Sequence, residues 1–151
     1  MNPLLLIGGG YVAYKLLQQH SYGDPESALQ RWGEALGTND VETVVANYQR
    51  HMGSAPIPAL WGTFSENLES GIGAIRQYFI DLFADHPGIT VDFKSLDSKQ
   101  LMGDVAVLSG SYVFNSPKAG AVPARYTFVV RKCPKSGTWR IVTHHSSIFA
   151  E

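Results

Sequence analysis

The sequence predicts an α+β domain in which helices cover one face of a strongly curved, mostly antiparallel sheet. Helical spacing of apolar residues dominates the chain up to His86-Pro87, and long runs of β-branched and aromatic residues follow it. Helices that precede the strands, rather than alternate with them, are typical of α+β folds. With 151 residues, 44% of them apolar, the chain can build one hydrophobic core. We expect that domain over residues 24–151.

Charge and cysteine content exclude several kinds of site. The formal net charge is -1 and there is no basic run, so nothing favours a nucleic-acid partner. Cys133 is the only cysteine, which excludes an intrachain disulfide and a CxxC metal or redox site. A structural zinc needs about four converging ligands, and adjacent strand histidines such as His144 and His145 face opposite ways. We expect no metal and no cofactor.

Residues 1–20 are predicted to form a hydrophobic arm separate from the domain. The segment from Pro3 to Leu17 is uncharged except for Lys15, whose long side chain can reach polar surroundings. It is shorter than the roughly 20 apolar residues of a membrane span and lacks the basic start and cleavage site of a secretory signal. The large apolar side chains of the arm are Leu4, Leu5, Leu6, Ile7, Tyr11, Val12, Leu16 and Leu17.

Three interpretations of this arm remain open. It packs on the surface of the protein itself, it anchors the domain in a membrane or a partner complex, or it is a cleaved signal. Gly8, Gly9 and Gly10 weaken an isolated helix by roughly 1 kcal/mol each, which favours a segment held by contacts. We favour the anchor, and therefore a membrane-associated location.

Three helices are predicted before residue 90. The first begins at Asp24-Pro25-Glu26 and ends at Gly37. The second begins with a capping box formed by Asn39 and Glu42, and the third ends at His86-Pro87-Gly88. Each helix has an apolar stripe, and the three stripes are Ala28, Leu29, Trp32, Ala35 and Leu36, then Val41, Val44, Val45 and Tyr48, then Ile72, Ile75, Phe79, Leu82 and Phe83.

Strands are predicted in the remaining segments. Residues 53–63 are rich in Pro and Gly, so only short edge strands are expected there. Trp61 in this segment is either a lid over the mouth of the core or a residue that stacks on a ligand. Four long strands follow, over Ile89–Leu96, Val105–Asn115, Ala124–Lys132 and Thr138–Phe149, and turn residues such as Asp97-Ser98 separate them.

Strand alternation predicts an aromatic pocket inside the curved sheet. Successive side chains point to opposite faces, so the bulkier face of each strand is expected to point inward. The residues assigned to the pocket are Trp61 at its mouth, Tyr112, Tyr126, Phe128 and His145. The same rule sends His144 outward, toward solvent or a subunit partner.

Catalysis in such a pocket would need a base, usually with an orienting partner. No Asp or Glu falls clearly on an inward face, and Ser146 and Ser147 lack a nucleophile elbow. If the protein is an enzyme, the candidates are His145 as acid or base and Tyr112 as hydrogen-bond donor. Otherwise His145 is a core histidine whose hydrogen bonds are satisfied.

The final strand resembles that of a known family. Gly137-Thr138-Trp139-Arg140-Ile141-Val142-Thr143-His144-His145-Ser146-Ser147 is similar to the end of the calcium/calmodulin-dependent protein kinase II association domain, particularly in its stand-alone bacterial relatives. These belong to the nuclear transport factor 2-like (NTF2-like) and SnoaL-like superfamily. Gly71-x-x-x-Ile75-x-x-Tyr78-Phe79 and Gly103-Asp104-x-Ala106 support the resemblance. It covers about residues 26–151 and implies the NTF2-like cone.

The resemblance implies self-association more than a particular ligand. Association domains of this type form dimers that assemble into rings, without catalysis of their own, and bind small anions in an arginine-lined cavity. The late histidine of that family matches His145, but Tyr112 and Phe128 stand where the pocket arginines would be. Our leading hypothesis is therefore a non-catalytic scaffold or accessory subunit that is at least dimeric through the outer face of its sheet and is tethered by its arm. The alternative is a SnoaL-like enzyme or a hydrophobic-ligand binder that uses the aromatic pocket.

Overall fold

The computed structural model describes residues 23–50 and 53–150. Within them the helices are α2 (Ser27–Thr38), α3 (Val41–Val45) and α4 (Ile72–Asp85), and the strands are β1 (Ala59–Trp61), β2 (Leu68–Ser70), β3 (Thr90–Met102), β4 (Val105–Ser116), β5 (Gly120–Lys132) and β6 (Trp139–Ile148). The predicted arm, residues 1–20, lies outside the described residues. None of the described helices is long and apolar enough to cross a membrane.

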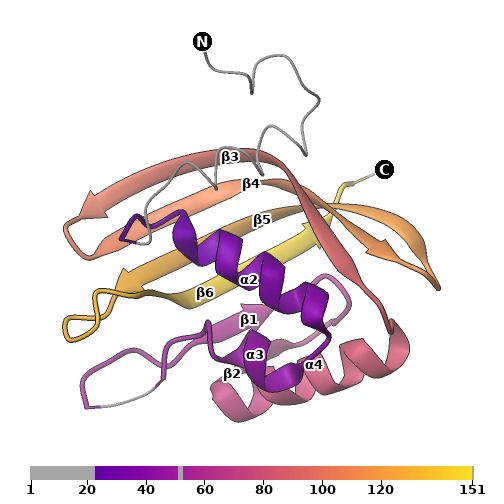
Figure 1. Cartoon of the computed structure of the whole chain (residues 1–151), viewed down its shortest axis with the longest axis horizontal. Helices are drawn as coiled ribbons and strands as arrows, with labels where there is room; N and C mark the ends of the chain where they lie inside the picture. The colour runs from indigo at the N-terminus through magenta and orange to yellow at the C-terminus, as the bar shows by residue number, and fades with distance from the viewer. Residues whose placement is uncertain (1–22, 51–52, 151) are drawn as a thin grey trace.

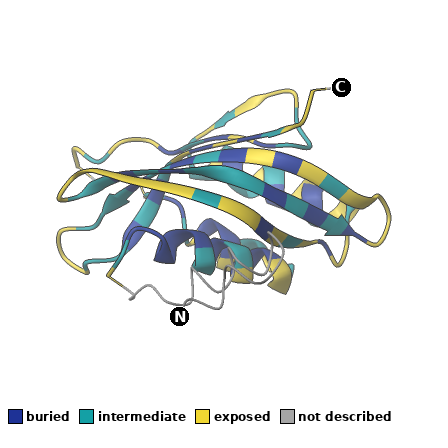
Figure 2. Ribbon diagram, turned by 90° about the horizontal axis from the view of Figure 1, so that it is seen from above, coloured by how far each residue is buried: buried dark blue, intermediate teal, exposed yellow. Residues whose placement is uncertain are grey.

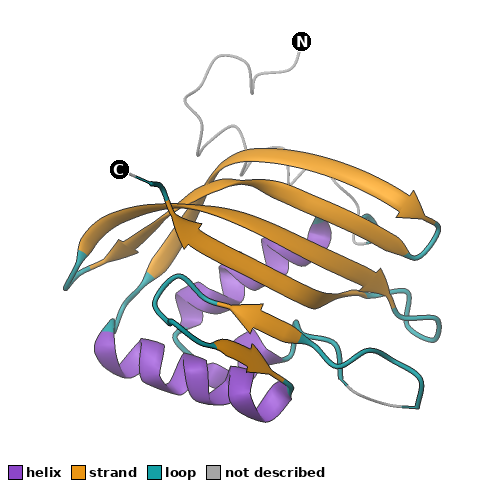
Figure 3. Ribbon diagram, turned by 180° about the vertical axis from the view of Figure 1, so that it is seen from behind, coloured by secondary structure: helices purple, strands orange, loops and turns teal. Residues whose placement is uncertain are grey.

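One six-stranded sheet, in the order β2-β1-β6-β5-β4-β3, carries the described helices on a single face (Figures 1 and 3). Its neighbouring strands are antiparallel except for β1 and β6, which pair in parallel. The sheet is curved and not closed, and the helices lie in its hollow. This confirms the predicted α+β class, with helices packed on a curved, mostly antiparallel sheet.

Some predicted boundaries were wrong for local reasons. Asp40, not Asn39, caps α3, because its carboxylate accepts a hydrogen bond from the Thr43 amide at 3.0 Å. Asn39 instead ends α2 in a left-handed conformation, with φ of 54°, and its side-chain oxygen accepts a 2.7 Å bond from the Gly88 amide. The predicted turn at Asp97-Ser98 is also absent, since β3 stays paired with the long strand β4 as far as Met102.

A β-bulge in β6 reverses one central prediction. Val129 of β5 pairs with Thr143 and Val130 pairs with Ile141, so Val142 is an extra residue on the β6 side. Ile141 is buried before the bulge and His144 after it, while His145 is exposed. The prediction that His145 points inward was therefore wrong, because a bulge changes which residues of a strand share a face.

The chain after α3 holds this bulge in place. The Ile141 amide donates to the Asn47 carbonyl at 2.8 Å, and the Gln49 amide donates to the Ile141 carbonyl at 2.7 Å. The Arg140 guanidinium also donates to the Ala46 carbonyl. A segment almost a hundred positions earlier in the chain thus fixes which β6 side chains enter the core.

The core fills the space between the helices and the inner face of the sheet. Buried side chains alternate with exposed or half-buried ones along the strands (Figure 2). Tyr112, Tyr126 and Phe128 lie on the inner, buried face, as alternation predicts. Trp61 does not cover the mouth of the core, because it is 46% exposed and pairs with the exposed His145 on the opposite face.

Candidate functional site

A chain of hydrogen-bonded, buried side chains crosses the core. It links Trp32 of α2 to Tyr48, which follows α3, and continues to His144 of β6 and Tyr112 of β4. The Trp32 indole donates to the Tyr48 hydroxyl at 3.2 Å. His144 Nδ1 lies 3.0 Å from the Tyr48 hydroxyl, and its Nε2 lies 3.1 Å from the Tyr112 hydroxyl. Both imidazole nitrogens therefore have a phenol as partner.

The far end of the chain fixes the direction of its protons. Tyr112 donates to Ser146 Oγ at 2.5 Å, and Ser146 in turn bonds the Thr63 hydroxyl. Because the Tyr112 hydroxyl proton is donated to Ser146, the Tyr112 oxygen can only accept a hydrogen bond from His144, whose Nε2 therefore carries the proton. Nδ1 then accepts a hydrogen bond from the Tyr48 hydroxyl, whose oxygen in turn accepts a hydrogen bond from the Trp32 indole. The neutral Nε2–H tautomer of His144 thus satisfies each hydroxyl and ring nitrogen in one direction.

Burial keeps this network uncharged at neutral pH. Loss of hydration lowers the pKa of His144 to about 3, and electrostatic interaction with neighbouring His145 adds to the shift. Burial also raises the pKa of the Tyr48 and Tyr112 phenols well above the ordinary value. Among the described residues, none of the hydrogen bonds of His144 or of the two phenols involves a carboxylate. An imidazole with so low a pKa is a weak general base near neutral pH.

Aromatic rings occupy the place of the predicted pocket. The His144 ring stacks on Phe128 with centroids 3.9 Å apart, and Trp32 meets His144 edge-on at 5.0 Å. The cavity beside them, bounded by Phe64 and Ser146 among others, holds about 10 Å³. That is about the space that one water requires. Tyr112, Tyr126 and Phe128 thus form a packed core here, and a ligand role for them stays a prediction.

Sequence reasoning did not assign Trp32, Tyr48 or His144 to a site. Trp32 and Tyr48 were expected as apolar stripe residues, and both are buried. A buried indole or phenol needs a hydrogen-bond partner. The prediction that both side chains lie in one core could therefore have indicated a buried polar network. No signal in the strand pattern itself indicated the bulge that turns His144 toward them.

The outer face of the sheet forms a second candidate site, because no described helix covers it (Figures 1 and 3). We call this the outer face, and on β4, β5 and β6 it includes Val105, Val107, Ser109, Ser111, Val113, Arg125, Thr127, Val129, Arg131, Thr143, His145 and Ser147. At its β1 edge the Trp61 and His145 ring centroids lie 6.4 Å apart. Leu68 of β2 pairs with Trp61 and is 53% exposed. This side therefore presents short side chains beside an exposed aromatic edge.

Metal-binding groups do not gather in the part of the chain that the structure describes. No cluster of three or more His, Cys, Asp or Glu side chains lies there in a position to hold an ion. The predicted absence of a metal and of a cofactor stays a prediction.

Comparisons with known proteins identify the family. Residues 26–150 match the family model described as calcium/calmodulin dependent protein kinase II association domain. A solved candidate association domain of this kind from Xanthomonas campestris is 31% identical, with a TM-score of 0.70, and the match covers 83% of this chain and 85% of that one. No curated protein of similar sequence was found.

More distant structures share the fold. A candidate dehydratase of the NTF2-like family from Streptomyces avermitilis is 18% identical with a TM-score of 0.71, covering 83% of this chain and 93% of that one. An NTF2-like protein from Pseudomonas putida is 16% identical with a TM-score of 0.68, covering 95% and 92%. The chain has the NTF2-like fold and belongs to the calcium/calmodulin-dependent protein kinase II association domain family.

Proposed function

We propose that the chain is a non-catalytic association domain that pairs with a second copy of itself through the outer face of its sheet. The observation that carries the proposal is the uncovered outer face, with Trp61 46% exposed and Leu68 53% exposed at its edge. Along its middle run Val107, Val129 and Thr143, which are neighbours in register. Short, uncharged side chains of this kind can pack closely against an identical surface, as a twofold dimer requires.

The size of the outer face fits a stable dimer. Strands β3 to β6 are 10 to 13 residues long. At about 3.3 Å per residue and about 4.8 Å between strands, four of them present on the order of 750 Å². A stable protein interface buries about 800 Å² on each partner. The face is therefore large enough without any contribution from a helix.

On β4 and β5 few positions of the outer face are charged, and the edge strand β3 adds Asp97 and Lys99, which pair with Ser109 and Val107. Arg125 donates from Nε to Ser147 Oγ at 3.2 Å, and Arg131 lies 4.0 Å from the Asp104 carboxylate. On β4 and β5 the paired rows between the two arginines hold Thr127, Val129 and Ser109, which are uncharged. Depletion of charge at the centre, with charged groups toward the rim, is the composition expected of a protein interface.

The inner face supports the non-catalytic reading over the SnoaL-like alternative. That alternative needs a competent base and space for a substrate. The described core holds an imidazole whose pKa is lowered to about 3, beside a cavity of about 10 Å³. The exposed His145 is separated from the core by the sheet itself, because it lies on the outer face. We therefore keep the enzyme as the alternative and favour association.

The tether is a further part of this proposal. Residues 1–20 would attach the domain to a membrane or a larger complex, so that the protein acts there as an accessory subunit. Support comes from the sequence alone, since the segment is apolar from Pro3 to Leu17 except for Lys15. Deleting Met1 to Gln19 should move the protein from the membrane or complex fraction of a native cell extract to the free fraction. Equal distribution of the two forms would remove the tether from the proposal.

Sedimentation velocity in mild detergent tests self-association directly. We expect the full-length chain to sediment as a dimer or larger oligomer, and Val129→Glu to be monomeric because it places a charge in the middle of the outer face. Ile80→Glu is the matched control, since Ile80 lies on α4, on the helical side, and is 43% exposed. A monomeric wild type, or a Val129→Glu variant that stays associated like Ile80→Glu, would contradict the proposal.

A further inference from the structure

Two turns lie next to each other at one end of the sheet. The β3–β4 turn is Gly103-Asp104, and the β5–β6 turn spans residues 133–138. The Lys132 amide donates to the Asp104 carbonyl at 2.8 Å, which holds the two turns together. Figure 1 shows both turns and the start of α2 at the left end of the sheet. We call this the turn end, and it comprises residues 23–26, 99–105 and 131–139.

Two apolar side chains remain exposed at the turn end. Leu101 is 61% exposed and Met102 is 66% exposed, more than any other large apolar side chain that the structure describes. Leu101 is the extra residue of a β-bulge, since Gln100 pairs with Ala106 and Met102 pairs with Val105. Edge strands are commonly protected by polar and charged side chains. An apolar pair at the end of such a strand indicates a surface that meets another body.

Two lysines lie beside this apolar pair without an ion-pair partner. Lys132 ends β5 and Lys135 lies in the β5–β6 turn, and neither forms an ion pair with any described residue. The acidic side chains of the two hairpins are already paired with cations, as Asp97–Lys99 and Asp104–Arg131. Asp24, just before α2, adds a further acidic residue to this end. The two lysines are therefore the groups on these turns that can attract an anionic surface.

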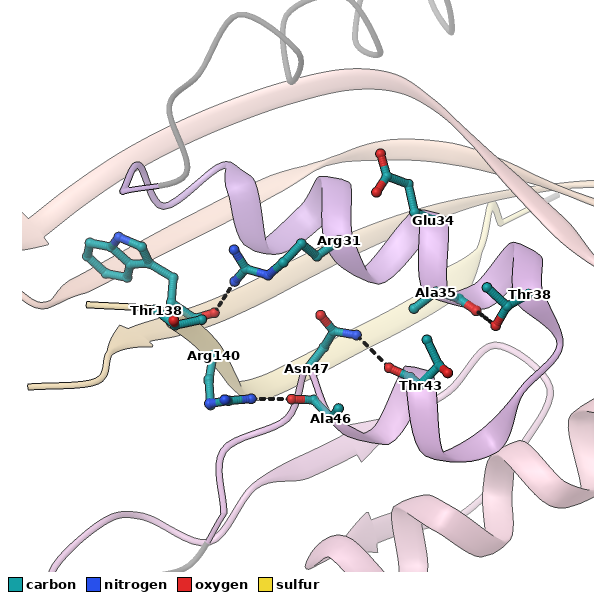
Figure 4. A pocket seen from close by; sticks show the side chains of 10 residues that line it. Arg31, Glu34, Ala35, Thr38, Thr43, Ala46, Asn47, Thr138 and Arg140 are labelled. Atoms are coloured by element: carbon teal, nitrogen blue, oxygen red, sulfur yellow. Dashed lines mark hydrogen bonds between the residues drawn. The ribbon is translucent and has the colours of Figure 1, made fainter. Parts of the chain in front are cut away.

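The predicted arm joins the domain at this same end. The Trp139 indole donates to the Gly23 carbonyl at 2.7 Å, and Ser98 Oγ donates to the buried Glu26 carboxylate at 2.5 Å. Further along α2, Arg31 donates to the Trp139 carbonyl at 2.5 Å (Figure 4). These bonds fix the first described residue against β3 and β6, next to the two turns. Residues 1–20, with their apolar run from position 3 to 17, therefore enter the domain beside the exposed apolar pair.

We propose that the turn end docks on an anionic phospholipid bilayer, with Leu101 and Met102 inserted among the headgroups and Lys132 and Lys135 at the lipid phosphates. Inserted apolar area and attraction between lysines and anionic lipids together determine how strongly a protein binds a membrane surface. The inference rests on the membrane form of the proposed tether, because an arm in the bilayer would hold this end against it. The lysines and the position of the arm favour a bilayer over a second copy, for which the outer face is the larger surface.

Flotation of the full-length chain with vesicles of phosphatidylcholine containing about 30% phosphatidylglycerol tests the docking. All proteins carry Val129→Glu, which keeps self-association out of the comparison. Leu101→Ser/Met102→Ser should lower the partition coefficient about tenfold. Ile148→Ser/Phe149→Ser should leave it unchanged, because these residues are 58% and 49% exposed at the other end of β6.

Lysine variants test the electrostatic part of the docking. Lys135→Gln should weaken binding to the anionic vesicles about fivefold and leave binding to pure phosphatidylcholine unchanged. Lys118→Gln is the matched control, since Lys118 is exposed in the β4–β5 turn at the opposite end of the sheet. An equal loss for the two lysine variants would contradict a docking surface at the turn end.

A fluorescent label separates failure of the docking from failure of the tether. In the Cys133→Ser chain, a label on Met102→Cys should be quenched by spin-labelled lipid, and a label on Lys118→Cys should not. A full-length chain that does not float with the vesicles would overturn both the membrane tether and the docking. If the chain floats but the label at position 102 stays in water, or Leu101→Ser/Met102→Ser floats like its control, only the docking is overturned. Loss of self-association in that double variant without Val129→Glu, at unchanged flotation, would assign the pair to a contact between copies instead.

Discussion

His144 and His145 are neighbours in the chain and lie in opposite environments. His144 is 2% exposed, bonded to two phenols, and its pKa is lowered to about 3. His145 is exposed on the outer face, beside the ring of Trp61. Adjacent strand residues face opposite ways, and the bulge at Val142, upstream in the strand, decides which of the two histidines faces inward. The strand's register, and not the residue type, therefore decides which histidine is structural and which is available to a partner.

The same contrast applies to the two faces of the sheet. On the inner face the polar atoms of Tyr48, Tyr112 and His144 bond one another, and no described buried side-chain polar atom lacks a partner. On the outer face Trp61 and His145 present apolar and aromatic surface to whatever lies outside the chain. The inner face is complete within one chain, and the outer face is the one that a second copy would complete.

The largest expected effect is the difference in unfolding free energy between alanine variants of the two histidines. His144→Ala should lower the free energy of unfolding by about 3–5 kcal/mol, because it opens a cavity and leaves the Tyr48 and Tyr112 hydroxyls without a partner. His145→Ala should change it by no more than about 0.5 kcal/mol in the monomeric Val129→Glu background, as for an exposed residue. Urea unfolding of the two variants measures this. Equal losses would mean that the two environments do not differ.

The pH dependence of stability should be the next largest effect. His144 has a pKa of about 3 in the folded chain and an ordinary value of 6.5, so below pH 6.5 the unfolded chain takes up a proton that the folded chain does not. The contribution of His144 to the free energy of unfolding is then fully present above pH 6.5. It falls toward pH 3, by up to about 1.4 kcal/mol per pH unit.

His144→Gln should remove this slope between pH 6 and pH 4, whereas His145→Gln should retain it. Urea unfolding at several pH values gives the comparison. Asp40 and Glu42, whose pKa values are lowered by hydrogen bonds to Thr43 and Arg76, lose their contribution only near or below their ordinary pKa values of 3.8 and 4.5. They are common to all three proteins, so the difference between variants isolates the histidine. The same slope in the His144→Gln variant would contradict this assignment.

The smallest expected effect concerns the bulge itself. After deletion of Val142, regular alternation from Ile141 passes through Thr143 and brings His144 inward again. We therefore expect the deletion to cost only about 1–2 kcal/mol, mainly from weakened contacts to the segment around Asn47. Histidine NMR titration should still find the lowered pKa at His144. A lowered pKa at His145 instead would show that the bulge does not set the register as described.

The sequence contained enough information to predict the fold and the inner positions of β4 and β5. Tyr112, Tyr126 and Phe128 are buried as expected because the pairing of β4 with β5 runs without a bulge, so strict alternation holds. Alternation failed in β6 because its bulge is bonded to Asn47 and Gln49. No local pattern around Val142 encodes a contact with a segment so far away in the chain.

The same distinction between local pattern and distant contact explains which parts of the candidate site could be predicted. Helical spacing indicated that Trp32 and Tyr48 are core residues, and both are. It could not indicate that the Tyr48 hydroxyl meets His144, since that contact needs α2, the segment after α3 and β6 to be assembled. Turn residues at Asp97-Ser98 likewise predicted a break that the pairing of β3 with β4 overrides. Local propensity was reliable where the tertiary contacts agree with it.

Acrylamide quenching of tryptophan fluorescence tests most directly whether the outer face is an interface. Trp32 and Trp139 are 2% and 1% exposed, so quenching reports mainly on Trp61, which is 46% exposed in the single chain. We predict that Trp61 is protected in the wild type and quenched readily in Val129→Glu at the same concentration, and that Trp61→Phe abolishes the difference. Equal quenching of the wild type and Val129→Glu would contradict burial of this face against a second copy.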